Sequence, residues 1–164
     1  MVEIKVKRDG SGGNAYMKNA LHYVHDKNGE RPLSLHGNGV DPTSADAAYE
    51  QMYAVKNYFG KTSGNPIVHL IVSYDKTVQD AETACRYTEQ IAAYYADQFQ
   101  TMQCTHEKLH GKSRYHTHII ANSVSFVNGM MFRSGVPDMQ GFCHHVEQVT
   151  GCRTRLDFEK MKEK

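Results

Sequence analysis

The sequence has no long apolar segment, little net charge and no paired cysteine motif. Among its 164 residues no run is apolar over the length that a transmembrane helix needs, and the opening residues, MVEIKVKRDG, lack the apolar core of a signal peptide. Lysine and arginine number 19 against 18 acidic residues, which gives a formal net charge of only +1. The four cysteines show no Cys-x-x-Cys spacing. These absences predict a cytoplasmic protein with reduced thiols.

The length and composition predict one globular domain with a real core. Apolar residues make up 40% of the chain and charged residues 23%, as in ordinary soluble domains. We expect the domain to span residues 1–151 and a charged tail to span 152–164. Because phosphate contacts supply most non-specific affinity for DNA, a net charge of +1 requires any nucleic-acid site to use local basic patches.

Periodicity predicts alternating strands and helices along the chain. Glu3 to Lys7 alternates polar and apolar residues as a half-exposed strand does, and apolar residues from Met17 to Val24 follow helical spacing. The remaining predicted elements are a loop or short strand over 31–40, a helix over 43–58, a buried strand over 66–74, a long helix starting with a capping box at 77–80, strands around 104 and 116, an Asn-Gly hairpin at 128–129, and helices over 137–149 and in the tail. Hairpin-linked strands beside such helices favour an α+β fold with a central antiparallel sheet flanked by helices.

The segment from 102 to 132 carries the strongest chemical pattern. Residues two apart on a strand share a face, so His116 and His118 point the same way, together with Ile120 and Asn122. If the apolar segment before His106 pairs antiparallel with this strand, His106 lies beside the pair. Three neutral imidazoles with open positions suit a catalytic divalent metal.

This segment, HEKLHGKSRYHTHIIANSVSFVNG, resembles the third motif of the MobA-type relaxases, the mobilisation nucleases within the HUH endonuclease superfamily. Their usual pattern is His-x-Asp, four residues, then His-x-His-x-x-x-Asn. The histidine pair and Asn122 match it. Lys108 stands where Asp is usual, the gap between His106 and His116 is three residues longer, and Thr117 is less apolar than the residue between the family's two histidines. The resemblance covers almost the whole chain and implies the α+β fold above.

Relaxases cut with a tyrosine on or beside the first helix. The segment Ala20-Leu21-His22-Tyr23-Val24-His25-Asp26-Lys27 resembles the family's first motif, which identifies Tyr23 as the candidate nucleophile. A phenol is a weak nucleophile at neutral pH, which is why the reaction needs help from a base and a metal. Tyr16 is the reserve candidate, and His22 is a further one because some relatives use histidine.

The resemblance also implies a reaction and its participants. A relaxase nicks one strand at a transfer origin, forms a 5′-phosphotyrosine link and leaves a 3′ hydroxyl, so the strand can later be rejoined. Magnesium or manganese is the expected cofactor. The expected partners are single-stranded origin DNA, accessory DNA-binding proteins and a secretion-system coupling protein, in a bacterial cytoplasm during conjugative transfer or mobilisation of a plasmid or integrative element.

Other residues receive supporting roles. Glu107 or a nearby histidine is the expected base, Asn122 would hydrogen-bond the histidines, and Ser73 resembles the serine of the family's second motif, which lies near the cut DNA. His69 is expected to be a hydrogen-bonded core histidine, or to support the metal ligands from behind. Tyr115 and Phe132 are candidates for stacking on bases. Basic residues expected along the DNA are Lys5, Lys7, Arg8, Lys108, Lys112, Arg114 and Arg133.

Two alternatives remain open. A relaxase-derived module that binds single-stranded DNA without cutting it would also have this pattern, and it is favoured by the altered His106 spacing and by Lys108. A rolling-circle replication initiator or transposase of the same superfamily is the second alternative. It is disfavoured because its tyrosine usually follows the histidine pair.

Overall fold

The computed structural model describes the chain except residues 9–12, 27–30, 110, 112 and 160–164. Its elements are β1 (Val2–Lys7), α1 (Gly13–His25), β2 (Ser34–Asn38), α2 (Ala45–Tyr58), β3 (Ile67–Ser73), α3 (Ala81–Ala92), the 3₁₀ turn η1 (Ala93–Tyr95), β4 (Thr101–Glu107), β5 (Tyr115–Asn122), α4 (Val136–Thr150) and β6 (Thr154–Phe158). The helix and strand predictions from 3–7 through 116–122 are each matched by an element, with β2 as the short strand. None of the helices described is long and apolar enough to cross a bilayer.

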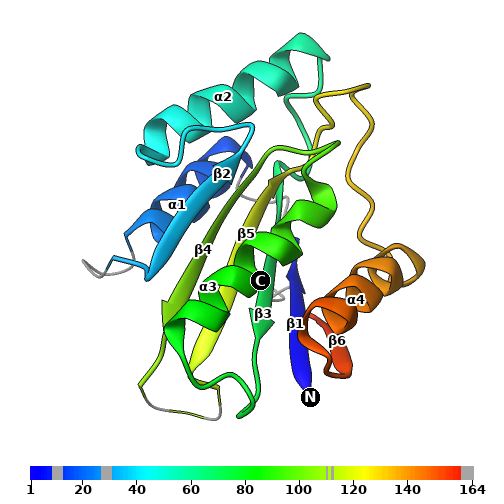
Figure 1. The fold of residues 1–164 in the computed structure, drawn as a ribbon. Coiled ribbons are helices and arrows are strands. Elements are labelled where there is room, and N and C mark those ends of the chain that lie inside the picture. Colours follow the sequence, from blue (N-terminus) through cyan, green and yellow to red (C-terminus); the bar gives the residue numbers. More distant parts are fainter. Residues whose placement is uncertain (9–12, 27–30, 110, 112, 160–164) are drawn as a thin grey trace.

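The strands form one six-stranded sheet in the order β2-β4-β5-β3-β1-β6. Every neighbouring pair is antiparallel except β1 and β6, which run parallel. The sheet therefore confirms the α+β prediction of a central, mostly antiparallel sheet with helices packed on it. The two strands that carry the histidines, β4 and β5, lie next to each other inside the sheet (Figure 1).

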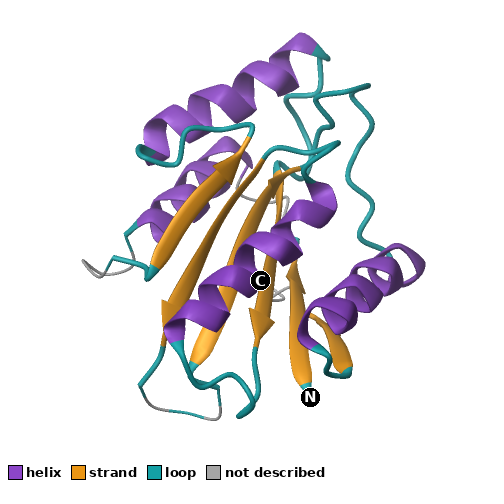
Figure 2. Cartoon of the chain, viewed as in Figure 1, coloured by secondary structure: helices purple, strands orange, loops and turns teal. Residues whose placement is uncertain are grey.

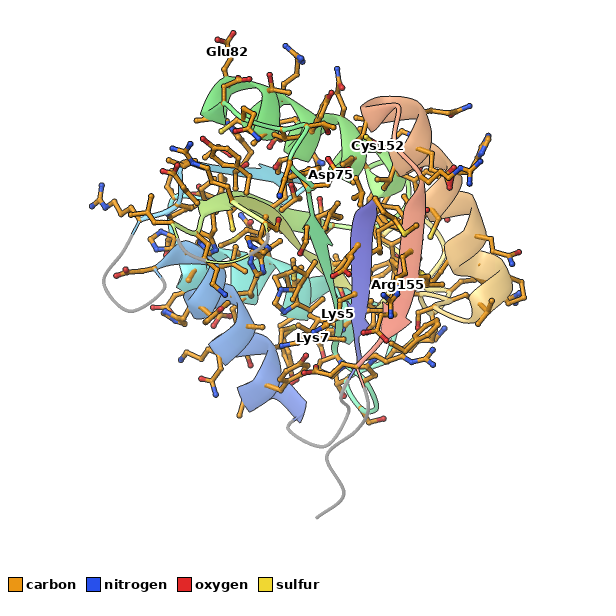
Figure 3. All side chains as sticks on the ribbon, turned by 90° about the horizontal axis from the view of Figure 1, so that it is seen from below. Lys5, Lys7, Asp75, Glu82, Cys152 and Arg155 are labelled. Atoms are coloured by element: carbon orange, nitrogen blue, oxygen red, sulfur yellow. The ribbon has the colours of Figure 1, made fainter. Side chains whose placement is uncertain are left out.

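One face of the sheet is covered by α3 and α4. Alternate residues of β3, namely Val68, Leu70 and Val72, are fully or almost fully buried in the core on this side. Tyr95 and Phe142 bring the aromatic rings of η1 and α4 into the same core, with centroids 5.3 Å apart. Figure 3, viewed from below, shows α3 on one side of the sheet and α1 on the other.

The residues that the structure describes cover the opposite face only in part. Met17 and Leu21 of α1 pack with Met102 of β4 and Ile120 of β5 in a second core, which α2 completes through Met52. The main contacts of α1 with the sheet are to β4 and β5. The residues of β1 on this face are polar and reach solvent, and this part of the sheet forms the floor of a groove described below.

The tail differs from its prediction. Residues 154–158 form β6, a strand paired with β1, where we expected a helix in a charged tail. Leu156 and Phe158 pack against the core under α3 and α4, while Arg155 and Asp157 are exposed. The sheet therefore extends past residue 151, the boundary that we expected for the domain.

Two local predictions also need correction. The Asn128–Gly129 turn forms, with Gly129 at φ 72°, but only one bridge, Val124 to Met131, links its two sides. Figure 2 shows the connection from β5 to α4 as a long loop and not as a hairpin. Helix α3 begins at Ala81 and is capped by Asp80, whose carboxylate accepts from the Thr83 N–H at 2.8 Å, so Thr77 is not its cap.

Candidate active site

Three histidines from β4 and β5 meet on the face of the sheet that α1 covers. His106 of β4 lies directly opposite His116 of β5 in the antiparallel register, and His118 is two residues further along β5. The longer turn between the strands therefore leaves His106 beside the pair, as antiparallel pairing predicts. Directly opposed side chains on such strands have Cβ atoms about 4.5–5.5 Å apart, within reach of a shared ion.

His118 is at the centre of this cluster. Its ring centroid is 4.9 Å from that of His106 and 6.0 Å from that of Tyr23, which meets it edge-on at 69°. On its other side, His118 Nδ1 lies 3.0 Å from Nε2 of His69 on β3. The cluster thus joins α1, β3, β4 and β5, which are far apart in the sequence.

His69 is buried beneath the cluster. Only 5% of its surface is exposed, and burial lowers its pKa to about 3, with smaller contributions from the nearby charges of Lys7 and His106. An imidazole with such a pKa is neutral at physiological pH. His69 therefore serves as a neutral hydrogen-bond partner, which agrees with the prediction of a hydrogen-bonded core histidine.

His116 is turned toward neighbouring serines. Its Nδ1 lies 2.9 Å from Ser73 Oγ, and its Nε2 lies 3.1 Å from the Ser113 carbonyl oxygen. A carbonyl only accepts, so Nε2 carries a proton in this arrangement, and in the neutral ring Nδ1 then accepts from the serine hydroxyl. Ser73 is thereby placed beside the histidines, at the end of β3.

The donor set is of a kind that divalent metals accept. As the side chains lie, no three histidine, cysteine or acidic groups of the described residues are close enough to share an ion. His106, His116 and His118 nevertheless occupy neighbouring positions on β4 and β5, and imidazole is a common ligand of divalent transition metals. Cys104 lies 3.7 Å from His106 Nε2, and burial raises the pKa of its thiol to about 12, so it is a protonated thiol in the metal-free protein.

Tyr23 projects from α1 at the margin of the second core. Its neighbours Leu21 and Val24 are fully buried, whereas 39% of Tyr23 is exposed, so its ring reaches His118 while remaining open to solvent. The other two candidates are placed differently. Tyr16 packs against the core between α1 and α2, and His22 Nε2 lies 2.9 Å from the Asp46 carboxylate of α2.

A groove of about 900 Å³ opens over the histidines and continues across β3, β1 and β6. We call it the histidine groove. Its described lining residues are Glu3, Ile4, Lys5, Arg31, Leu33, Ile71, Ser73, His106, Glu107, Lys108, Leu109, His116, His118, Arg155 and Asp157. Figure 3 shows the labelled Lys5 and Lys7 on β1 and Arg155 on the adjacent β6.

Some of the basic residues expected along DNA line the histidine groove, and others are bonded to other parts of the protein. Lys5 and Lys108 line the histidine groove, and Lys7 lies opposite His69 on β1, 3.6 Å from the Glu159 carboxylate. Arg8 donates to the Ser134 carbonyl oxygen at 3.0 Å and stacks on the Phe158 ring, so it ties β1 to the loop before α4. Lys112 lies outside the described residues.

Two other arginines do not line the histidine groove. Arg114 donates from Nε to the Glu107 carboxylate at 2.6 Å and lies over the Tyr115 ring. Arg133 lines a separate hollow of about 670 Å³ beside η1 and α4 and is not part of the histidine groove, contrary to the expectation for the basic cluster. The physical reason is the long loop from β5 to α4, which carries Arg133 away from the strand ends.

Two predicted supporting roles, those of Asn122 and Glu107, are corrected or constrained. Asn122 donates to the Met52 carbonyl oxygen at 3.1 Å and to Gln100 Oε1 at 2.9 Å, so it joins β5 to α2 at the end remote from the histidines, contrary to its predicted role. Glu107 lines the groove, but its carboxylate is held by Arg114; its role as a base stays a prediction.

The residues expected to stack on bases are also unavailable. Tyr115 is only 3% exposed, and Phe132 packs into the aromatic cluster around Tyr95, with centroids 4.8 Å apart. Arg31 and Arg155 were missed among the groove residues. Arg155 had a usable signal, since apolar and charged residues alternate along Thr154–Phe158 as in a strand.

Comparisons with known proteins identify the family and the fold of this chain. Residues 17–151 match the family model described as "Relaxase: MobA/VirD2-like, nuclease domain". No curated protein matches the sequence. A solved structure described as the molecular basis of vancomycin resistance transfer in Staphylococcus aureus superimposes with a TM-score of 0.60 at 11% identity, covering 96% of this chain and 97% of that chain. That likeness shows a shared fold, and the family match covers most of the chain. The chain therefore belongs to the MobA/VirD2-like relaxase nuclease domain family.

Proposed function

We propose that this chain nicks one DNA strand at a transfer origin and becomes covalently attached to the cut end through Tyr23. The observation that carries the proposal is the position of the Tyr23 ring, 6.0 Å from that of His118 and open to solvent beside the histidine groove. A helix residue and strand residues from distant parts of the sequence meet there, as a reaction on a bound phosphodiester requires.

In the proposed step, the Tyr23 hydroxyl oxygen attacks the scissile phosphorus. A new bond forms between phosphorus and the phenol oxygen while the bond to the 3′ oxygen breaks. The phenol proton passes to a base, and the departing 3′ oxygen gains a proton to become a hydroxyl. One phosphodiester replaces another, so the strand can be rejoined by reversal of the same step.

His106, His116 and His118 would hold Mg²⁺ or Mn²⁺. When bound, such an ion neutralises charge on the scissile phosphate. Ser73 lies beside His116 and can hydrogen-bond either that ring or a phosphate oxygen at the groove. Glu107 stays the proposed base if DNA displaces Arg114 from its carboxylate; otherwise a neighbouring imidazole takes the proton.

The DNA path proposed here follows the histidine groove. Lys5 and Arg155 lie on the exposed floor of β1 and β6, and among the described residues no carboxylate forms an ion pair with either of them. Both cations can therefore contact phosphates, supplemented by Lys108 at the rim. Family membership supports origin DNA in a bacterial cytoplasm as the setting, with accessory DNA-binding proteins and a coupling protein as partners.

The test is covalent capture of DNA. Fluorescent single-stranded oligonucleotides tiled across the region flanking the encoding gene are incubated with protein and Mn²⁺, and adducts are resolved by denaturing electrophoresis. Wild type is expected to form one adduct that Tyr23→Phe cannot form, while Tyr16→Phe and His22→Ala retain it.

Loss of the adduct in Tyr16→Phe or His22→Ala, with retention in Tyr23→Phe, would reassign the nucleophile. DNA binding without any adduct would instead favour the non-cutting DNA-binding module. That alternative is supported by one observation, namely that both ring nitrogens of His116 lie within hydrogen-bond distance of Ser73 and Ser113.

A further inference from the structure

His69 is a polar residue at a buried position of an otherwise apolar strand. It interrupts the apolar run of β3 between Val68 and Leu70, and it is 5% exposed on the face toward α1. A buried polar side chain without a hydrogen bond destabilises a protein, so a partner must compensate for its burial. That partner is His118, whose Nδ1 lies 3.0 Å from His69 Nε2.

The contact links two rings on adjacent strands. His118 lies opposite Ile71 on β3, two residues beyond His69, and the ring centroids of the two histidines are 5.2 Å apart at 47°. Two neutral imidazoles form a hydrogen bond only if one supplies an N–H and the other a lone pair. The direction of this bond therefore decides which nitrogen of His118 carries the proton.

We infer that His69 is a positioning residue whose Nε2 accepts a hydrogen bond from Nδ1–H of His118. This direction leaves Nε2 of His118 unprotonated, on a ring that lines the histidine groove and has the rings of His106 and Tyr23 as neighbours. The reverse direction would place a proton on His118 Nε2 and prevent that nitrogen from binding a metal. The catalytic consequence rests on the proposed function, but the tautomer itself does not.

Three variants separate orientation from folding. His69→Leu keeps an apolar side chain in the buried site but removes the acceptor. His69→Gln keeps an amide oxygen near the place of Nε2. His145→Leu is the matched control, because His145 Nε2 is hydrogen-bonded to the Gln90 carbonyl oxygen on the α3 and α4 side. Thermal unfolding checks that each variant is folded.

Long-range proton–nitrogen NMR of the metal-free proteins reads the tautomers directly. We expect His118 as the Nδ1–H form in wild type, His69→Gln and His145→Leu, and a loss of that preference in His69→Leu. Wild-type His118 as the Nε2–H form, or an unchanged tautomer in folded His69→Leu, would overturn the inference.

Mn²⁺ calorimetry gives the second readout. His69→Leu is expected to bind Mn²⁺ about 10- to 100-fold more weakly than wild type, while His69→Gln and His145→Leu stay within about threefold. Equal Mn²⁺ affinity in His69→Leu and wild type would count against the positioning role. Absence of a Mn²⁺ site in wild type, with the expected tautomers, would support the orientation by His69 and overturn the proposed metal centre.

Discussion

The two faces of β5 hold their polar side chains in different ways. On the α3 side, the fully buried Thr117 hydroxyl lies 2.6 Å from Thr88 and 2.5 Å from Tyr74, and Thr88 also lies 2.7 Å from Thr105. On the groove side, His116 is half-buried and bonded to serines that solvent can reach. The hydroxyl network joins β5 to its neighbours and to α3, whereas His116 is held by groups at the edge of the histidine groove. This comparison predicts that substitutions on the groove side change chemistry and that substitutions on the α3 side change stability.

The largest effect is expected from His116→Ala. Removing one of three proposed ligands should abolish the saturable Mn²⁺ site and lower adduct formation by roughly a thousandfold, because several kcal/mol of charge stabilisation are lost. Unfolding temperature should change little, since the ring is partly exposed and both serines can bond water. Calorimetry and the adduct assay measure the two effects.

His36→Ala is the control for this change. His36 is an exposed histidine of β2 and is absent from the groove lining, so its replacement should leave both readouts unchanged. Undiminished adduct formation in His116→Ala would mean that His116 stays with its serines and that the comparison fails on the groove side.

A second prediction concerns pH and a buried lysine at the far end of β5. Lys56 of α2 is 1% exposed and donates to the Pro66 carbonyl oxygen at 2.5 Å and to Ser123 Oγ at 2.9 Å, and burial lowers its pKa from 10.5 to about 8. Below pH 8 both folded and unfolded chains carry the charge, and the cost of burying it is fully present. As pH rises from 8 to 10.5, the folded chain loses the proton before the unfolded chain does. The contribution of Lys56 to the free energy of unfolding therefore rises, by an amount on the order of 3 kcal/mol.

Lys56→Met isolates this contribution. The variant lacks the rise, so the difference in free energy of unfolding between wild type and variant should change between pH 8 and 10.5 in favour of wild type. Urea unfolding at a series of pH values measures it. Burial raises the pKa of Tyr74, Tyr95 and Cys104, which opposes the rise in both proteins and cancels in the difference. A difference that does not vary with pH would show that Lys56 titrates normally.

The third prediction concerns the hydroxyl network on the α3 side of β5. Thr88→Val removes the hydroxyl that joins Thr105 and Thr117 while keeping the side-chain shape, so two buried hydroxyls lose a partner. We expect the free energy of unfolding to fall by about 1–3 kcal/mol, with adduct formation by the folded protein within a few-fold of wild type. Urea unfolding measures the first quantity and the adduct assay the second.

Thr150→Val is the matched control. Thr150 is a partly exposed residue of α4 whose hydroxyl donates to the Val146 carbonyl oxygen at 2.8 Å. Its replacement should therefore lower the free energy of unfolding by less than Thr88→Val does. A large loss of adduct formation in folded Thr88→Val would show that the network also controls the chemistry.

The two faces also show which features can be predicted from sequence. The period-two alternation of β5 correctly placed His116 and His118 on one face, and antiparallel pairing brought His106 beside them despite the longer turn. Alternation cannot show where a ring turns, which is why the contacts of His116 with Ser73 and Ser113 were not predicted. The polar Thr117 departs from the family pattern, and the structure gives the physical reason: its hydroxyl is hydrogen-bonded to Thr88 of α3.

Long-range pairing limited the prediction elsewhere. Asn122 fits the family motif, but its amide is used by Met52 and Gln100, which only the packing of α2 reveals. The charged composition of the tail suggested a helix, whereas the alternation along Thr154–Phe158 and a free edge of β1 favour a strand. Missing β6 also meant missing Arg155 as part of the groove.

The smallest effect is expected from Arg155→Gln, which tests how far the groove side extends. Basic and acidic residues alternate on its floor, where Lys5 lies beside Asp157 and Glu3 beside Arg155 in the parallel register, so few phosphates can be neutralised. Loss of one phosphate contact should weaken binding of single-stranded DNA by about three- to tenfold and reduce the salt slope by about 0.7. Fluorescence anisotropy at a series of salt concentrations measures both.

Arg153→Gln is the control, since Arg153 is exposed but absent from the groove lining. Equal slopes in Arg155→Gln and wild type would confine the DNA to the strands that carry the histidines, and the β1–β6 edge would then serve only to complete the sheet.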